Sequence, residues 1–467
     1  MSREQVLSIA FCVFITYFLV VMSYYILLIV IGISQTRKRS FESREEDYSI
    51  LSHSTFTVPV TIIVPAHNEE DYIENCILSL LNLEYPEFEI IVVNDASTDR
   101  TLDILGNILK LKSLEKSYER TFRDGKIHEV YTSERYPRVT VITKSGLKKA
   151  GALNAGLNFS HYKYICNIDA DTILEPDALL KVMAHIQKNP EKIIGVGSYF
   201  GLLNGLNIKG GKILERSFSY NPIVAYQNLE YIRSFIGSRI SWSRFNAMPV
   251  ISGGFGVWRR DILFEIGGYD PNFTCEDMEL TFRAHDYNVK NNKDYTIVSL
   301  PDYVGWTEGP SNMRSLIIQR NRWQRVTNEV VERYKHMLFN PRYKWFGFLT
   351  LPYFLFYEVL GVVFELTSIG VVIWAWFAGI LNLMTFFAFL VLMALTQTLV
   401  SVLVLFAFVR DQRSFRLRYS MYLLFLSFFE LFLYRWMITI AKAQGMFDYL
   451  RGVKTFDQYK RYLKKNP

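Results

Sequence analysis

Hydrophobic residues gather near the two ends of this chain and predict helices that cross a membrane. No charged residue occurs from Gln5 to Thr36, and a bilayer core needs about 20 apolar residues, so we expect a transmembrane helix over residues 6–34. A signal peptide would have a shorter apolar region, about 7–15 residues, that ends in small residues, whereas this run ends in Gln-Thr-Arg-Lys-Arg. The positive-inside rule then places the basic and polar linker that follows, residues 35–57, in the cytosol.

A second hydrophobic block predicts transmembrane or interfacial helices over residues 345–441, followed by a basic tail over 442–467. The part from Leu366 to Val409 carries no charge. As a single helix it would be about twice as long as the ~30 Å hydrocarbon core. We therefore expect the chain to reverse direction near residues 379–382.

Charged residues inside this block leave the number of spans open. Glu358 and Glu365 are seven positions apart and so share one helix face. Glu430 and Arg435 lie in the last apolar segment, which is either a span that faces other helices or an element at the interface. A third span in this block would put the basic tail outside the cell, which the positive-inside rule disfavours.

Between the hydrophobic ends, residues 58–312 alternate short β-branched runs with amphipathic stretches, which predicts an α/β domain with a mostly parallel sheet. We expect strands at 60–64, 89–93, 139–142 and 164–168, helices at 76–81 and 151–159, and an irregular surface loop at 111–137. Ligands of such sheets bind beyond the carboxyl ends of the strands. Polar side chains follow three of these ends, in His67-Asn68-Glu69, Asn94-Asp95 and Asp169-Ala170-Asp171.

Composition and missing motifs exclude several classes of protein. Half of the residues are hydrophobic and 21% are charged, with a net charge of +7, which excludes a disordered chain. The four cysteines form no CxxC pair, which disfavours a disulfide scaffold or a zinc finger and fits reduced thiols that face the cytosol. There is no P-loop and no H-E-x-x-H, and Gly195 to Gly201 misses G-x-G-x-x-G by one residue. ATP-driven motors, zinc hydrolases and dinucleotide enzymes therefore lose support.

Acidic residues at the strand ends are the first candidates for chemistry. Asp169 and Asp171 offer two hard oxygen ligands for Mg²⁺ or Mn²⁺, ions that usually keep waters and bridge substrate phosphates. A D-x-D triplet by itself is more often a solvated turn. Asp95 is either the N-cap of the next helix or, if Ser97 or Thr98 takes that role, an acceptor for a ligand at the strand edge.

Two further groups each have a structural and a functional interpretation. Lys148 and Lys149 precede a glycine- and alanine-rich helix start, where they are either solvated or part of a phosphate site. Asp277 follows Thr274 at the spacing of a capping box. A carboxylate in a first helical turn is also held ionised by the helix dipole, as a general base must be.

A last group lies in an interfacial helix region that we expect over 313–344. Gln319, Arg322 and Trp323 fall on one face of a helix there. An amphipathic helix at the membrane surface, with Trp as an anchor and Arg on lipid phosphates, explains this spacing on its own. The functional alternative is a helix face that binds substrate.

Taken together, these segments resemble the family 2 inverting glycosyltransferases. The matching motifs come in the order of that family: Val64-Pro-Ala-His-Asn-Glu-Glu70, Asn94-Asp95, Asp169-Ala-Asp171, Glu276-Asp277 and Gln319-Arg-Asn-Arg322-Trp323. They are most similar to the membrane-embedded D, D-x-D, E-D, Q-x-x-R-W synthases of cellulose, chitin, hyaluronan and poly-β-1,6-N-acetylglucosamine. Ser252 to Arg260 and Gly267-Gly-Tyr269 are similar to the acceptor-side segment of the last branch. The chain departs from the pattern at His67, where Tyr is common, and at Cys275, where Thr or Gly usually precedes Glu-Asp.

This resemblance implies a GT-A fold for the cytosolic domain and a role for each matching residue. Asp277 would deprotonate the acceptor hydroxyl, and Asp169 with Asp171 would hold Mg²⁺ or Mn²⁺ on the diphosphate. The nucleotide-sugar contacts would come from Ala66, Glu69, Asp95, Lys149, Asp169 and Arg322, with Asp95 on the uridine. The acceptor contacts would come from Glu276, Gln319 and Trp323. Departing UDP gathers negative charge, which the metal and Arg322 would neutralise.

We therefore expect a multi-pass protein of the bacterial plasma membrane with a cytosolic catalytic domain. It would use a UDP-sugar, best UDP-N-acetylglucosamine, to build a β-linked polysaccharide and pass it through its own spans. Its partners would be the donor, a growing glycan or lipid acceptor, membrane lipids and, as an open point, an accessory subunit, but no nucleic acid. The alternatives are transfer of one sugar to a lipid, a non-catalytic nucleotide-sugar sensor, which would be expected to lack an acid, and a transporter, which would repeat its spans.

Overall fold

The computed structural model describes residues 2–45, 48–52, 57–115, 118–411 and 417–453, and the chain divides into two compact units. The sheet unit consists of residues 38–219 and 246–309. Of the described residues, the helical unit contains those up to Arg37, Tyr220–Phe245 and those from Pro310 to Val453. Most of the expected basic tail, and part of the expected linker, lie outside the described residues.

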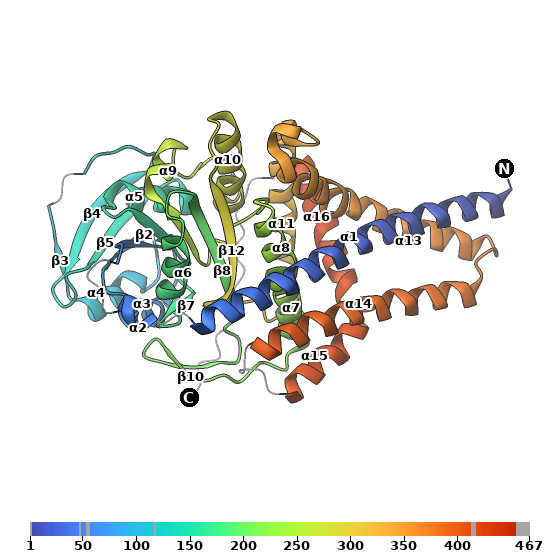
Figure 1. The fold of residues 1–467 in the computed structure, drawn as a ribbon, viewed down its shortest axis with the longest axis horizontal. Coiled ribbons are helices and arrows are strands. Elements are labelled where there is room, and N and C mark those ends of the chain that lie inside the picture. Colours follow the sequence, from blue (N-terminus) through green and yellow to red (C-terminus); the bar gives the residue numbers. More distant parts are fainter. Residues whose placement is uncertain (1, 46–47, 53–56, 116–117, 412–416, 454–467) are drawn as a thin grey trace. The chain divides into compact units, whose positions relative to one another are not determined.

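Within the described residues, the sheet unit has one ten-stranded sheet in the order β3-β4-β5-β2-β1-β6-β11-β8-β12-β7 (Figure 1). The strands are β1 (Val60–Ala66), β2 (Phe88–Asp95), β3 (Leu111–Ser113), β4 (Lys126–Ser133), β5 (Val139–Ser145), β6 (Tyr164–Asn167), β7 (Ile173–Leu174), β8 (Ile193–Leu202), β11 (Gly256–Arg259) and β12 (Thr296–Thr307). β5, β2, β1 and β6 run parallel at the centre, as do β8 and β12. The other neighbours pair antiparallel. The predicted α/β class is confirmed, but the expectation of a mostly parallel sheet is wrong, because antiparallel strands extend the parallel centre on both sides.

Helices connect the parallel strands at the centre of this sheet. They and the other helices of the unit are α2 (Tyr48–Ser52), α3 (Ile73–Leu81), α4 (Thr101–Leu109), α5 (Lys148–Phe159), α6 (Ala178–Gln187), α9 (Arg260–Glu265) and α10 (Glu276–Lys290). A short hairpin of β9 (Asn207–Lys209) and β10 (Lys212–Glu215) follows β8. The strands and helices expected from the sequence are all found, with small shifts at their ends.

The expectation of an irregular loop over 111–137 is wrong. β3 and β4 lie in this stretch and extend the sheet beyond β5. Most side chains of β4 are polar, and its pairing with β5 shifts register between Ile127 and Glu129. Strands are usually predicted from alternating hydrophobic and polar residues. β4 is mostly polar and its alternation is interrupted, so this signal is weak.

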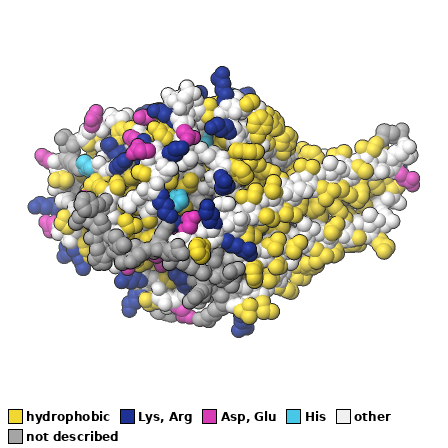
Figure 2. All heavy atoms as spheres, viewed as in Figure 1, with side chains coloured by type: hydrophobic (Ala, Val, Ile, Leu, Met, Phe, Trp, Pro, Cys, Tyr) yellow, Lys and Arg dark blue, Asp and Glu magenta, His cyan; other side chains and the backbone are white. Residues whose placement is uncertain are grey.

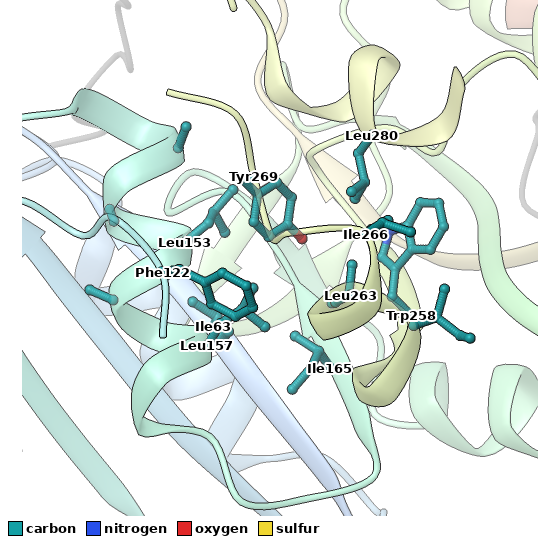
Figure 3. Packing of buried hydrophobic residues seen from close by; sticks show 14 of the residues in the cluster. Ile63, Phe122, Leu153, Leu157, Ile165, Trp258, Leu263, Ile266, Tyr269 and Leu280 are labelled. Carbon is teal, nitrogen blue, oxygen red and sulfur yellow. The ribbon is translucent and has the colours of Figure 1, made fainter. Parts of the chain in front are cut away.

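The hydrophobic core of this unit forms where α5 packs on β1. Leu153 of α5 and Ile63 of β1 belong to one buried cluster, and Tyr269 joins it (Figure 3). Gly156 allows the close approach, since a Cβ there would lie 2.4 Å from Cγ2 of Ile63. Asn154 of α5 exchanges two 2.8 Å hydrogen bonds with the backbone of Tyr269. The middle of α5 is thereby tied to the segment that leads into α10.

His285 on α10 predicts a pH dependence of stability. The side chain is buried and its Nε2 lies 3.0 Å from the carbonyl of Met248; burial lowers the pKa of His285 to about 4, against the opposing effect of this hydrogen bond. The unfolded chain takes up a proton near pH 6.5, so stability is lost as the pH falls from about 6.5 to about 4, by up to about 3 kcal/mol. We expect His285→Gln, which keeps a donor for Met248, to lose less thermal stability between pH 7 and pH 5 than the parent. Equal losses would contradict this prediction.

The helical unit contains the long apolar helices. Its elements are α1 (Arg3–Glu45, which continues into the sheet unit), α7 (Pro222–Ile232), a π-helix (Arg233–Arg239), α8 (Ile240–Arg244), α11 (Met313–Arg333), a run of short helices from Phe346 to Val359 that includes α12 (Leu351–Tyr353), α13 (Leu360–Phe377), α14 (Leu383–Asp411), α15 (Leu417–Phe429) and α16 (Tyr434–Leu450). α1 runs past residue 34, so the segment expected as a linker begins in helical conformation. The reversal expected near 379–382 is confirmed, with Gly379 at a φ of +69° between α13 and α14.

Three helices among the described residues are long and apolar enough to cross a membrane: Arg3–Glu42, Phe346–Phe377 and Leu383–Phe408. Hydrophobic side chains cover the face of the long helices α1, α13 and α14 that Figure 2 shows. α15 and α16 meet at an angle of 62° and would add a fourth, broken span. Glu430 at this break forms two hydrogen bonds with Arg233, of 2.6 and 2.9 Å. The last apolar segment therefore faces other helices of its unit.

The two acidic residues before α14 also pair inside the helical unit. Glu358 binds Lys442 at 2.6 Å, and Glu365 binds Arg435 and the hydroxyl of Thr439. All three partners lie on α16. The prediction that Glu358 and Glu365 share one helix face is confirmed, and each charge is compensated by a partner, as an apolar environment requires.

Candidate functional site

Three neighbouring strands at the centre of the sheet lead to residues predicted to bind the donor. Ala66 and Asp95 are the last residues of β1 and β2, and Asp169 follows β6 by two positions. β1 pairs in parallel with both β2 and β6. The three carboxyl ends therefore lie at the same edge of the sheet, where ligands of α/β sheets bind.

Lys149, in the first turn of α5, links two of the predicted acids. Its Nζ lies 2.6 Å from Oδ1 of Asp169 and 2.8 Å from Oε1 of Glu276. Burial alone would lower the pKa of Lys149, but the charges of Asp169, Glu276 and Asp277 outweigh burial and hold that pKa well above its usual value. Lys149 is therefore a fixed positive charge among carboxylates.

The buried thiol of Cys76 on α3 is affected by three of the predicted acids. Burial raises the pKa of Cys76, and the charges of Asp171, Glu69 and Asp169 raise it further. The sulfur lies 3.9 Å from the carbonyl oxygen of Asp169. Thr307, at the end of β12, donates a 3.3 Å hydrogen bond to Oδ1 of Asp171. Cys76 and Thr307 thus contact Asp169 and Asp171 of the D-x-D triplet, and the charge of Glu69 also acts on Cys76.

The carboxylate of Asp277 is oriented by three hydrogen bonds. Oδ2 accepts from the N–H of Gly253 at 3.0 Å, and Oδ1 accepts from the N–H of Met278 at 2.6 Å and from the thiol of Cys275 at 3.0 Å. The capping-box expectation is wrong, because the N-cap of α10 is Cys275 and not Thr274. Asp277 is therefore held between a helix start and a separate loop.

Gly253 allows that loop to approach the acids. A Cβ at this position would lie 2.7 Å from Nζ of Lys149, 3.5 Å from Oε1 of Glu276 and 3.7 Å from Oδ1 of Asp169. A larger residue would displace the lysine. Because the N–H of Gly253 also binds Asp277, the structure brings these four predicted side chains to one place, which we call the acid cluster.

Asp95 has a different set of contacts. Its Oδ1 accepts a 2.6 Å hydrogen bond from Nζ of Lys144 on β5. Its backbone carbonyl accepts a 2.5 Å hydrogen bond from Nδ1 of His67, which places a proton on that ring nitrogen. Asp95 therefore uses one side-chain oxygen to bind Lys144 at the end of β2, and it does not cap a helix.

The helix after β2 starts later than the sequence pattern suggests. α4 begins at Thr101, and Asp99 binds the N–H and the hydroxyl of Thr101 at 3.0 and 2.6 Å, so neither Ser97 nor Thr98 is its cap. Burial would raise the pKa of Asp99, but these bonds and the N–H of Glu70 lower it overall. The N-cap of α4 is Arg100, whose side chain forms no cap hydrogen bond, so Asp95 does not cap this helix and the proposed caps Ser97 and Thr98 are wrong.

The remaining predicted residues lie on α11 of the helical unit. Gln319 is buried, Arg322 is half-buried and Trp323 is 38% exposed. The guanidinium of Arg320 lies 4.2 Å from the centroid of the Trp323 ring, and Arg320 is itself bound by the carboxylate of Glu230. The ring is therefore supported on one face by a fixed cation.

Three residues that contact the predicted site were not predicted from the sequence. Lys144 stands opposite Asp95 in the parallel register of β2 and β5, so knowledge of that register would have revealed the pair. Gly253 lies in the segment from Ser252 to Arg260 that the family resemblance marks, but nothing local predicts that its N–H binds Asp277. Thr307 reaches Asp171 only because the sheet places the end of β12 there.

Parts of this chain are similar in sequence to known glycosyltransferases. Residues 61–267 match the family described as Glycosyl transferase family 2. A poly-beta-1,6-N-acetyl-D-glucosamine synthase of Staphylococcus epidermidis is 28% identical over 275 residues, which are 59% of this chain and 56% of that protein. A probable glycosyltransferase of Bacillus subtilis is 30% identical over 316 residues, 65% of this chain and 64% of that protein. The matched region thus spans less than two thirds of either relative.

A solved structure shows the same fold. A mannosyltransferase of Pyrobaculum calidifontis, in complex with GDP-Man and Mn²⁺, superposes with a TM-score of 0.52 at 17% identity, covering 84% of this chain and 98% of that one. The predicted fold class is confirmed: a GT-A-type α/β domain flanked by helices apolar enough to cross a membrane. Residues 61–267 of this chain, which include the acids at the carboxyl ends of the central strands, thus match Glycosyl transferase family 2.

Proposed function

We propose that this protein is an inverting glycosyltransferase that uses a UDP-sugar, best UDP-N-acetylglucosamine, to build a β-linked polysaccharide at a membrane. The observation that carries the proposal is the acid cluster, in which Lys149 lies between Asp169 and Glu276 while Asp277 is oriented beside them. The relative named poly-beta-1,6-N-acetyl-D-glucosamine synthase supports the donor and the product.

Asp277 supports single displacement with inversion. Its carboxylate is fixed by three donors, so it is positioned to accept a proton from an acceptor hydroxyl. A single base that activates the acceptor directly needs no covalent sugar–enzyme intermediate. Attack then occurs on the face opposite the diphosphate, which gives a β-linkage from an α-linked donor.

The donor set of Asp169 and Asp171 fits Mg²⁺ or Mn²⁺. Such ions are often held by one or two carboxylates together with substrate phosphates. Within the described part of the chain, no group of three or more His, Cys, Asp or Glu side chains could hold a metal ion. When bound, the ion would offset negative charge on the diphosphate.

The helical unit supports the proposed location of the protein in a membrane. Its apolar helices support a multi-pass protein of the bacterial plasma membrane, and the basic residues after the first helix support a cytosolic domain. A growing glycan would be the acceptor and would leave through the spans. The alternative is transfer of one sugar to a lipid, which the same membrane helices also favour.

Product size separates these two functions. Purified protein in detergent, with Mg²⁺ or Mn²⁺, would be given each UDP-sugar in turn, and released UDP and product mass would be measured. A β-linked polymer from one donor supports the proposal, and a single sugar on a lipid supports the alternative. Binding of donor without any transfer would contradict both.

Trp323→Leu should reduce elongation by about tenfold or more, because leucine lacks the flat face on which a sugar ring stacks. Arg320 stays bound to Glu230, so the start of α11 should remain folded. Product length and UDP release would be compared with those of Met313→Leu, which alters the other large exposed hydrophobic side chain of α11. Wild-type polymer from Trp323→Leu would favour a membrane anchor instead.

Arg322→Lys should act on the donor side. Lysine keeps the charge but loses the planar fork that binds two phosphate oxygens. We expect UDP affinity measured by calorimetry to fall about tenfold, while Trp323→Leu leaves it unchanged. Equal UDP affinities in the parent and in Arg322→Lys would contradict a role of Arg322 on the diphosphate.

A further inference from the structure

Lys144 is placed so that it acts on a ligand only through Asp95. The two residues are direct partners in the parallel register of β5 and β2, so their side chains lie on the same face of the sheet. Nζ of Lys144 donates to Oδ1 of Asp95 at 2.6 Å and to the carbonyl of Gly146 at 2.5 Å. The side chain of Lys144 is 0% exposed, whereas that of Asp95 is 13% exposed.

The loop before β4 covers this lysine. Gly125 has a φ of +87°, and a Cβ there would lie 2.4 Å from the carbonyl of Ser145 and 3.2 Å from Cε of Lys144, so glycine is needed for the approach. Asp124, which is fully buried, holds the loop by accepting a 3.0 Å hydrogen bond from Asn158. Of this pair, only the Asp95 side chain is thus accessible from outside the protein.

This arrangement leaves one carboxylate oxygen of Asp95 for a ligand. Oδ1 is occupied by the ammonium, and no hydrogen bond from the described residues reaches Oδ2. A carboxylate only accepts hydrogen bonds. Uracil presents a single N–H donor between two carbonyl groups, which one oxygen satisfies. Guanine presents two adjacent donors, which fit a carboxylate with both oxygens free, and cytosine presents a lone pair that the carboxylate repels.

We propose that Lys144 is a positioning residue that sets nucleobase specificity, by turning Asp95 so that a single oxygen faces the base and selects uracil over guanine and cytosine. The inference rests on the proposed UDP-sugar donor and adds the residue that makes the site choose uridine. His67 supports the same arrangement, because its Nδ1–H binds the backbone carbonyl of Asp95.

The first test is the ratio of UDP to GDP affinity, measured by calorimetry on the full-length protein. Lys144→Met frees Oδ1 and the rotation of Asp95, so we expect the ratio to fall by about tenfold or more. Lys181→Met is the matched control, since Lys181 also bridges an aspartate, Asp177, and a backbone carbonyl, that of Tyr303. It should leave the ratio unchanged. Both ratios are insensitive to the fraction of folded protein.

The second test replaces a hydrogen-bond acceptor at position 95 by a hydrogen-bond donor. In Asp95→Asn, Lys144 would bind the amide oxygen and so point the NH₂ group toward the base, where it meets the lone pair of cytosine instead of the N–H of uracil. We expect this variant to bind CDP more tightly than UDP. In the double variant Asp95→Asn with Lys144→Met, which leaves no buried charge unpaired, the amide orientation is no longer set and this preference should disappear.

The outcomes separate this inference from the proposed function. A parent protein that prefers GDP or binds no nucleoside diphosphate would overturn both. A parent that prefers UDP, with the same UDP-to-GDP ratio in Lys144→Met, would overturn the role of Lys144 alone. A CDP preference that persists in the double variant would do the same.

Discussion

Asp277→Asn is expected to lower the rate of sugar transfer by about 10²–10⁴-fold, the usual contribution of a general base. The amide keeps the shape of the carboxylate but cannot take a proton from the acceptor hydroxyl. The measurement is UDP release with the preferred donor, beside UDP binding by calorimetry. The loss should appear in turnover, because Asp277 has no proposed contact with the nucleotide.

The surroundings of Asp277 predict a smaller, separate effect. If the amide oxygen keeps the bonds from Met278 and Cys275, the NH₂ group faces the N–H of Gly253, and two donors oppose each other. The loop of Gly253 lies against Lys149, so UDP affinity should weaken by no more than about tenfold.

The matched control is Asp286→Asn, which removes a carboxylate from the same helix. Asp286 pairs with Lys290 at 2.7 Å on α10, and its variant should turn over like the parent. Turnover of Asp277→Asn within a few-fold of the parent would show that Asp277 only orients the start of α10.

Asp171→Asn and removal of divalent metal should each lower transfer by about 10²–10³-fold, the usual loss when a group that stabilises developing charge is removed. Asp171 is buried and bound to the hydroxyl of Thr307. An amide can still accept that hydrogen bond, so the fold should persist. Activity would be measured in excess chelator and after return of Mg²⁺ or Mn²⁺.

The metal responses of the parent, of Asp171→Asn and of a control variant make this prediction specific. The parent should recover with added metal, whereas Asp171→Asn should need a higher metal concentration or fail to recover. Asp177→Asn, which removes an aspartate paired with Lys181 on α6, should respond to metal like the parent. Full turnover of the parent in chelator would contradict the role of Asp169 and Asp171 as metal ligands.

Much of the fold could be predicted because its signals are local. The first long apolar helix and the chain reversal near Gly379 could be predicted from the lengths of the hydrophobic segments alone. The central strands are short β-branched runs that end in polar residues, so their carboxyl ends could be placed before any pairing was known. The failures fall on residues with weak local signals: β4 is mostly polar, and the N-cap of α10 lies one residue later than the capping-box spacing suggests.

Local sequence is enough to predict which elements form and which acids stand at their ends, since hydrophobic period and strand–turn order act over a few residues. Which side chains meet depends on how these elements pack. Lys149 binds Asp169 and Glu276 because the sheet, α5 and α10 converge, and Lys144 binds Asp95 because β2 and β5 pair in one particular register. Such contacts join residues distant in sequence, and their geometry depends on burial and pairing of the whole sheet, which no local pattern encodes.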